Sequence, residues 1–326
     1  MTTLQSIIVS AALLLGAAPL FPAAALAGSC CGGGSGAALT VPAYARAVAD
    51  LSFDSELYDG YWNQHGAHTA DPPGSDLQQY RLNVGLGYRF ATDWQVGLTL
   101  PYIWNVNRYA GLSSSTNGLG DTTLSLAYQL IDDTSAWRVR DAKDLIPGVS
   151  LGLSLLFPTG ISPHDDVTSS FDVTGRGFYR LDGTLTIDKT IHPWNMSLAL
   201  SYGTHFERSV NREYGRYVEP YRKQLGDRAS AALSAGYNYV FGTGGDSLTG
   251  TISYAWLEEG EASYNGVDDN GSGFRKQSIG GMLTYANTDR DWSVRAGWNH
   301  ALGANGWGRN FPTTDIITVG VRYVFR

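Results

Sequence analysis

The side chains with the clearest chemical potential are charged residues that recur at every second position of otherwise apolar segments. Successive side chains of a β-strand point to opposite faces, so this spacing predicts one apolar and one polar face for each segment. The cations predicted on the polar face are Arg46, Arg81, Arg89, Arg180, Arg228, Lys276, Arg295 and Arg322. The acids predicted beside them are Asp50, Asp182 and Asp188.

These charges allow two interpretations if the polar faces together enclose a lumen. The ions could pair with one another and simply fill a narrow barrel. Alternatively, the surplus of cations could favour anions, because rings of Arg or Lys select anions in pores. Acidic loop residues could fold into such a pore and block it, and the candidates are Glu258, Glu259, Glu261, Asp268 and Asp269.

The only two cysteines, Cys30 and Cys31, are adjacent, so one chain cannot form a long-range disulfide framework. In an oxidising compartment they could form a vicinal disulfide or bridge to a partner. As thiolates they could bind Cu(I) or another thiophilic metal, although a closed metal site generally needs three or four ligands. Lipidation at Cys30, or no function for the pair, also remains open. We predict no other cofactor.

No group of residues resembles a catalytic site. A hydrolase in a barrel wall would need a nucleophile, a histidine and an acid close together. His205 falls on the polar face of a predicted strand, His192 falls in a turn, and the other histidines lie in or beside loops. We therefore predict a protein without enzymatic activity. The net charge of -7 argues against nucleic-acid binding, which requires a basic surface.

The N-terminal region is predicted to direct export. Residues 7–27 form the only long apolar run and end in Ala25-Leu26-Ala27, a pattern typical of signal peptidase cleavage. The absence of Lys and Arg from residues 2–10 departs from the usual signal peptide, and an N-terminal membrane anchor is the alternative. We predict a signal peptide over 1–27, a flexible Cys/Gly-rich periplasmic arm over 28–42, and a barrel over 43–326.

The elements that must position the charged residues are short strands. Apolar and polar residues alternate through about twelve segments, each near the length of a tilted membrane-spanning strand. The segments lie near residues 43–57, 77–90, 94–104, 121–131, 148–158, 178–188, 194–206, 228–241, 247–256, 276–287, 291–299 and 314–325. Short and long connections alternate, with one exception at 132–147. This pattern predicts an all-β fold, a transmembrane antiparallel up-and-down β-barrel in the bacterial outer membrane, with both termini periplasmic.

Aromatic residues distinguish this fold from a secreted β-sandwich, which also alternates. Trp94, Trp194 and Trp292 lie at the short-turn ends of apolar faces, and Trp104 and Trp256 at the long-loop ends. Two aromatic belts are typical of membrane interfaces, so we expect outer-membrane lipid around the barrel. The last strand carries Tyr323 and Phe325, which resembles the signal read by the outer-membrane assembly machinery, although Arg326 follows.

Three local motifs resemble a known family. They are LTLPY at residues 98–102, GLGDTTLSLAY at 118–128 and LFPTG at 156–160. They are similar to the outer-membrane family named for the meta-pathway of phenol degradation, whose members are also labelled transporters. The resemblance implies a barrel and a role in taking up hydrophobic or aromatic compounds. It implies no catalytic residue.

The combined features predict an outer-membrane channel or transporter for small solutes, with hydrophobic, aromatic or anionic compounds as candidates. The alternative is a structural barrel that sheathes a periplasmic metal- or redox-handling partner through an arm carrying Cys30 and Cys31. Conductance separates the two, because a plugged sheath should conduct no ions.

Overall fold

A computed structural model describes residues 40–241, 245–303 and 308–326. The predicted signal peptide and most of the predicted arm, with Cys30 and Cys31, lie outside the described residues. Within them, no helix has the length and apolar character needed to cross a bilayer.

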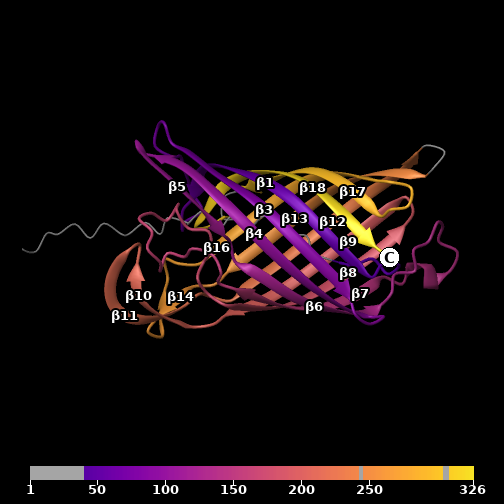
Figure 1. Ribbon diagram of the computed structural model, residues 1–326, viewed down its shortest axis with the longest axis horizontal. Coiled ribbons are helices and arrows are strands. Elements are labelled where there is room, and N and C mark those ends of the chain that lie inside the picture. The colour runs from indigo at the N-terminus through magenta and orange to yellow at the C-terminus, as the bar shows by residue number, and fades with distance from the viewer. Residues whose placement is uncertain (1–39, 242–244, 304–307) are drawn as a thin grey trace, which may run out of the picture.

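The chain folds into a closed antiparallel β-barrel of twelve strands (Figure 1). These are β1 (Ala47–Trp62), β3 (Asp76–Arg89), β4 (Trp94–Tyr109), β6 (Thr122–Ile131), β7 (Gly148–Phe157), β8 (Arg180–Ile191), β9 (Trp194–His205), β12 (Arg228–Phe241), β13 (Asp246–Glu259), β16 (Phe274–Ala286), β17 (Trp292–Leu302) and β18 (Phe311–Phe325). Each strand pairs with its neighbour, and β18 returns to β1. Closure satisfies backbone groups that lipid could not. The predicted fold class and the predicted number of strands are confirmed.

The two faces of the strands differ as the alternation predicts. On β1, Ser52 and Asp54 are buried, whereas Leu51 and Phe53 are exposed on the outside. On β13, Leu248, Ile252 and Tyr254 are all exposed on one side, so the strand presents a continuous apolar face outward, as contact with lipid requires. The apolar face therefore points outward and the polar face points into the lumen.

The two ends of the barrel have different architectures. At one end, which we call the short-turn end, the strands are joined by tight connections, except where 132–147 carries a short 3-10 helix, Ala142–Leu145. At the other, the long-loop end, the additional strands continue beyond the barrel, on the side away from the C-terminus (Figure 1). They are β2 (His68–Thr69), β5 (Leu112–Leu119), β10 (Arg208–Glu213), β11 (Arg216–Gln224), β14 (Ala262–Tyr264) and β15 (Val267–Asp269).

Aromatic rings form contacts around the outside of the short-turn end. Trp94 packs against Phe90 and Tyr128, with ring centroids 6.4 and 4.8 Å away. On the other side of the barrel, Tyr285 contacts Trp292 at 5.3 Å. These contacts form the aromatic belt that the sequence predicts at this end.

The N-terminal segment, residues 40–45, departs from the predicted flexible arm. Val41 is fully buried and packs with Ala45, Val48 and Val324 just inside the short-turn end. Its amide donates to Oε1 of Gln95 at 2.7 Å, and its carbonyl accepts from Nη2 of Arg89 at 2.6 Å. Burial of the apolar Val41 side chain is favourable, and the backbone groups of Val41 keep hydrogen-bond partners inside the barrel. This residue is therefore held in the lumen and not in solvent. The arm boundary predicted at residue 42 is therefore wrong, and the first strand begins only at Ala47.

Candidate solute pathway: a central chamber and a closed neck

A cavity of about 300 Å³ lies in the lumen, and we call it the chamber. Inward side chains of six neighbouring barrel strands, β1, β3, β4, β6, β7 and β8, together with Arg295 of β17, form its wall. Thr40 and Gln95 bound it toward the short-turn end, where the N-terminal segment enters the lumen. The chamber is therefore a cavity within the barrel lumen, on the short-turn side of most of the lumen's charged residues.

An ion triad joins β1, β17 and β18, and two of its members, Asp50 and Arg295, line the chamber. Arg295 donates two hydrogen bonds of 2.7 Å to the Asp50 carboxylate, and Nε of Arg322 donates a third at 2.9 Å. Asp50 is the most shielded of the three, with 9% of its side chain exposed against 13% and 25% for Arg295 and Arg322. The triad therefore carries a net positive charge and presents its cations to the lumen.

Above the triad, toward the long-loop end, the charges are balanced. Glu56 faces Arg81 at 3.7 Å, and Lys276 donates to the Thr314 hydroxyl at 3.0 Å. Asp54 accepts hydrogen bonds from Thr318 and from Asn83. The predicted large surplus of lumen cations is therefore wrong. Asp54 and Glu56 share the inward side of β1 with Asp50, and our sequence interpretation overlooked them.

A long connection, residues 158–179, folds back into the barrel mouth, and we call it the inner loop. Asn105 and Asn107, on the inner face of β4, donate to the carbonyls of Val173 and Phe171 at 2.9 Å. Val173 is fully buried. The side-chain amides of β4 thus hold the loop against the inner wall of the barrel.

The three family motifs meet at the base of the inner loop. The amide of Gly120 donates to the carbonyl of Pro101, and the carbonyl of Gly120 accepts from the Thr159 hydroxyl at 2.6 Å. The Asp121 carboxylate accepts from the amides of Gly160 at 3.1 Å and Arg176 at 2.8 Å. The motifs, which are far apart in sequence, therefore build one structure that anchors both ends of the loop.

Glycine at position 175 is required for this anchor. A Cβ there would lie 2.1 Å from Oδ1 of Asp121, so any larger residue would displace the carboxylate. Burial raises the pKa of Asp121, and the two amide hydrogen bonds oppose that shift.

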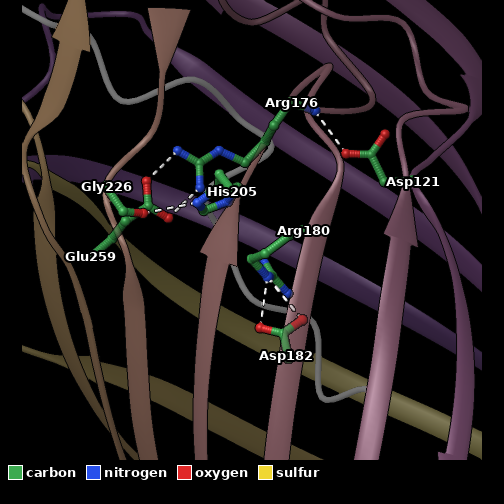
Figure 2. A network of polar contacts seen from close by, with 7 residues as sticks. All are labelled: Asp121, Arg176, Arg180, Asp182, His205, Gly226 and Glu259. Carbon is green, nitrogen blue, oxygen red and sulfur yellow. Dashed lines mark hydrogen bonds and ion pairs between the residues drawn. The ribbon is translucent and has the colours of Figure 1, made fainter. Parts of the chain in front are cut away.

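A polar network closes the mouth beside this anchor (Figure 2). The Arg176 guanidinium, from the inner loop, donates to both oxygens of Glu259 on β13, with Nη2–Oε1 at 2.6 Å. Nε of Arg180 contacts both oxygens of Asp182 at 2.8 and 3.0 Å. Nδ1 of His205 lies 2.8 Å from the carbonyl oxygen of Gly226 and must donate to it. We call this level of the lumen the neck.

Apolar packing continues the closure above the neck. Phe274, Ala301 and Phe311 form a buried cluster inside the long-loop end, with Trp62 and Leu257 against it. The Arg176 guanidinium lies 5.7 Å from the centre of the Phe274 ring, which adds a cation–π contact. Together the inner loop, the neck and this cluster fill the mouth of the barrel.

The hairpin β10–β11, which lies beyond the barrel, covers the inner loop from outside. The amides of Tyr214 and Gly215 donate to carbonyls of Pro163 and Asp165. Beneath it His164 is buried against Phe178, with ring centroids 5.6 Å apart. Burial, together with nearby Lys223 and Arg208, lowers the pKa of His164 to about 4.

The predicted site residues divide between the lumen and its rim. The residues that lie on the inner face are Arg81, Arg180, Asp182, Arg228, Arg295 and Arg322. Arg228 faces Glu259 in the β12–β13 register but forms no direct ion pair within the described part of the chain. The influence of these inner-face residues on ion selectivity stays a prediction.

Two predicted lumen residues lie outside the chamber. Arg46 is exposed at the short-turn rim, where Nη2 lies 3.3 Å from the Tyr88 hydroxyl on the outer belt. Arg89 donates to backbone carbonyls of the N-terminal segment and of the turn at Thr92. At a rim no neighbouring side chain forces a residue inward, so alternation misplaced Arg46. Arg89 keeps its inward side and holds the N-terminal segment.

The predicted acidic plug is also corrected. Glu258 pairs with Arg275 at 2.9 Å in a half-exposed position, and only Glu259 enters the mouth. Among described residues, the segment that fills the mouth is the inner loop. Our interpretation missed Arg176 because it lies in a loop, where no periodicity assigns a direction. The Gly-rich motifs on both sides of the loop were the available signal.

The metal hypothesis rests on residues outside the described part. Cys30 and Cys31 cannot be placed, and no group of His, Cys, Asp and Glu within residues 40–241, 245–303 and 308–326 could hold a metal ion.

The model of a family described as "Putative MetA-pathway of phenol degradation" matches residues 97–313, about two-thirds of the chain. The chain belongs to this family. The match includes all three motifs that anchor the inner loop, so the predicted resemblance is confirmed. A comparison with curated protein sequences gave no match.

Solved structures with this architecture include an outer membrane channel from Pseudomonas putida F1. It shares 14% identity at a TM-score of 0.64, with 89% of this chain and 98% of that chain covered. The β-domain of the Bordetella autotransporter BrkA shares 14% identity at a TM-score of 0.51, covering 86% of this chain and 100% of that chain. At such identities the likeness establishes an outer-membrane barrel fold for the family member described here.

Proposed function

We propose that this protein is an outer-membrane channel for small solutes with a mild preference for anions, and that its long-loop end faces the cell exterior. The barrel, with an apolar outer face and an inner chamber lined by hydroxyl and charged side chains, supports a channel. The single observation that carries the preference is the Asp50–Arg295–Arg322 triad, in which two cations share one acid that is more shielded than either of them.

The triad should act on ions in transit because of its position. At physiological salt the screening length is about 8 Å, so a charge on the chamber wall still influences an ion that crosses the chamber. Charges elsewhere on the inner face are largely paired, so they contribute less. The expected preference is therefore modest.

Reversal potentials across a KCl gradient in planar bilayers test this proposal. We expect weak anion selectivity for the natural protein. Replacing both cations, Arg295→Gln with Arg322→Gln, leaves Asp50 alone and should reverse the selectivity toward cations. Arg46→Gln, at the rim and outside the chamber, is the matched control and should change nothing.

A cation-selective natural pore, or selectivity unmoved by the double variant, would overturn the anion preference. A barrel that passes no ion even after the neck is opened would instead support the alternative of a sheath around a periplasmic partner. The neck-opening variant is Glu259→Ala, and its effect is argued in the Discussion.

A further inference from the structure

One wall of the chamber carries six hydroxyl groups, beside the small residues Ala127 and Gly152. The inward residues of three adjacent strands, β6, β7 and β8, supply them: Thr123, Ser125, Ser150, Ser154, Thr184 and Thr186. No sequence motif indicates this surface, because each strand contributes only small residues at alternate positions.

The hydroxyls form a regular grid. Ser125 lies beside Ser154 in the β6–β7 register, and Ser150 lies beside Thr186 in the β7–β8 register. Neighbouring strands are about 4.8 Å apart and alternate residues along a strand about 6.8 Å apart, which sets the spacing of the grid. The wall continues onto β9 and β12, where the Ser201 and Ser230 hydroxyls lie 2.6 Å apart.

This lining matches a hydrated solute better than an apolar one. A hydroxyl both donates and accepts, so it can replace water around a solute hydroxyl in either orientation. A polar group that loses water without replacement is strongly disfavoured, and the grid removes that penalty. No aromatic side chain of the described residues lines the chamber, so a hydrocarbon gains no stacking partner there.

We propose that the chamber is a transit site for small polyhydroxylated carboxylates, the chemical class of sugar acids. The solute hydroxyls contact the grid, and the carboxylate lies toward Arg295, which belongs to the same cavity on the opposite side. This inference rests on the proposed channel function and specifies its substrate class.

Swelling of proteoliposomes with three probes separates the two halves of the recognition. Glucuronate has a carboxylate and hydroxyls, benzoate has only the carboxylate, and glucose has only the hydroxyls. Benzoate is the smallest, so simple sieving predicts that it enters fastest. We expect glucuronate to enter faster than both other probes.

Variants assign the effect to the chamber. Ser125→Ala with Ser154→Ala and Thr184→Val removes three hydroxyls with little change of volume, and should bring the glucuronate rate down to or below that of benzoate. Arg295→Gln should bring it down to that of glucose. Ser55→Ala, on the outer face of β1, is the control and should leave the order unchanged. Heat-modifiable gel mobility verifies folding, and Ser154→Ala alone is the milder variant.

Each probe is measured in the natural protein and in Glu259→Ala, whose neck we expect to be open. If either admits solutes with benzoate fastest, or if the triple variant keeps the natural order, the sugar-acid inference is wrong while the channel stands. If neither admits any probe or chloride, the channel function fails, and the inference fails with it.

Discussion

The neck and the chamber occupy the same barrel but are built in opposite ways. The neck is dense: an inner loop, a bidentate Arg176–Glu259 pair and a buried aromatic cluster fill the lumen. The chamber is open, and its wall bears small hydroxyl side chains and one ion triad. The barrel strands are continuous through both, so the difference lies in what fills the lumen. We infer that the neck controls whether solutes pass and the chamber controls which ones do.

The largest effect is expected from breaking the neck at Glu259. Glu259→Ala leaves the partly buried Arg176 cation without its partner, which generally costs about 3–5 kcal/mol. Because Arg176 belongs to the inner loop, we expect the loop to loosen from the wall of β13 at this point. We expect a clear rise in single-channel conductance in planar bilayers.

A matched double variant controls for this result. Arg176→Met with Glu259→Leu replaces the ion pair by apolar side chains of similar volume beside Phe274, a change that is often nearly neutral. Its conductance should stay close to the natural value. An equal rise in both variants would show that the ion pair itself does not hold the neck closed.

Acidification should also loosen the neck through His164. Its pKa is about 4 in the folded protein against 6.5 for an exposed histidine, so the opened loop binds the proton more readily. The closed packing is intact above pH 6.5 and loses up to roughly 3 kcal/mol as the pH falls to about 4 and below. Conductance should therefore rise on acidification over this range.

His164→Phe should remove this pH dependence while keeping the contact with Phe178. Asp121 acts in the opposite sense, because its raised pKa means that acid relieves a buried charge and favours the closed anchor. A conductance that falls on acidification would assign the dominant pH response to Asp121 and exclude His164.

Leu86 and Asn83, on β3 at the height of the chamber, test the two faces of its wall. Leu86 is exposed toward lipid, so Leu86→Arg should cost roughly 2–4 kcal/mol near the membrane centre. Asn83→Arg points into the chamber near Asp54 and should fold nearly normally. Folding yields are compared by heat-modifiable gel mobility. Equal yields would contradict the face assignment.

The smallest effect is expected at the short-turn end. Deleting residues 28–45 removes Val41 and Ala45 from the lumen entrance, so the chamber should gain a wider exit and a modest increase in conductance. Deleting only residues 28–39 is the control and should leave the Val41 contacts in place. An identical increase in both would locate the restriction outside the segment at 40–45.

Most of the barrel could be predicted from the sequence. Alternation is a local property, because each strand residue points inward or outward by its own position in the pleat. It placed Arg295 and Arg322 correctly on the inner face and Leu86 on the outer face. It failed at Arg46, before the first strand begins, where no neighbour constrains direction.

What the sequence by itself determined is the barrel: twelve alternating segments, short and long connections, and aromatic belts leave few other ways to bury the apolar faces. Tertiary structure alone decided which charges pair and which loop enters the mouth. Asp50 meets Arg295 across 245 positions because closure makes β1 and β17 near neighbours through β18. The inner loop, and not the acidic segment, fills the mouth because Asn105, Asn107 and Asp121 offer it backbone partners there. Such contacts join segments distant in the chain, and no local pattern encodes them.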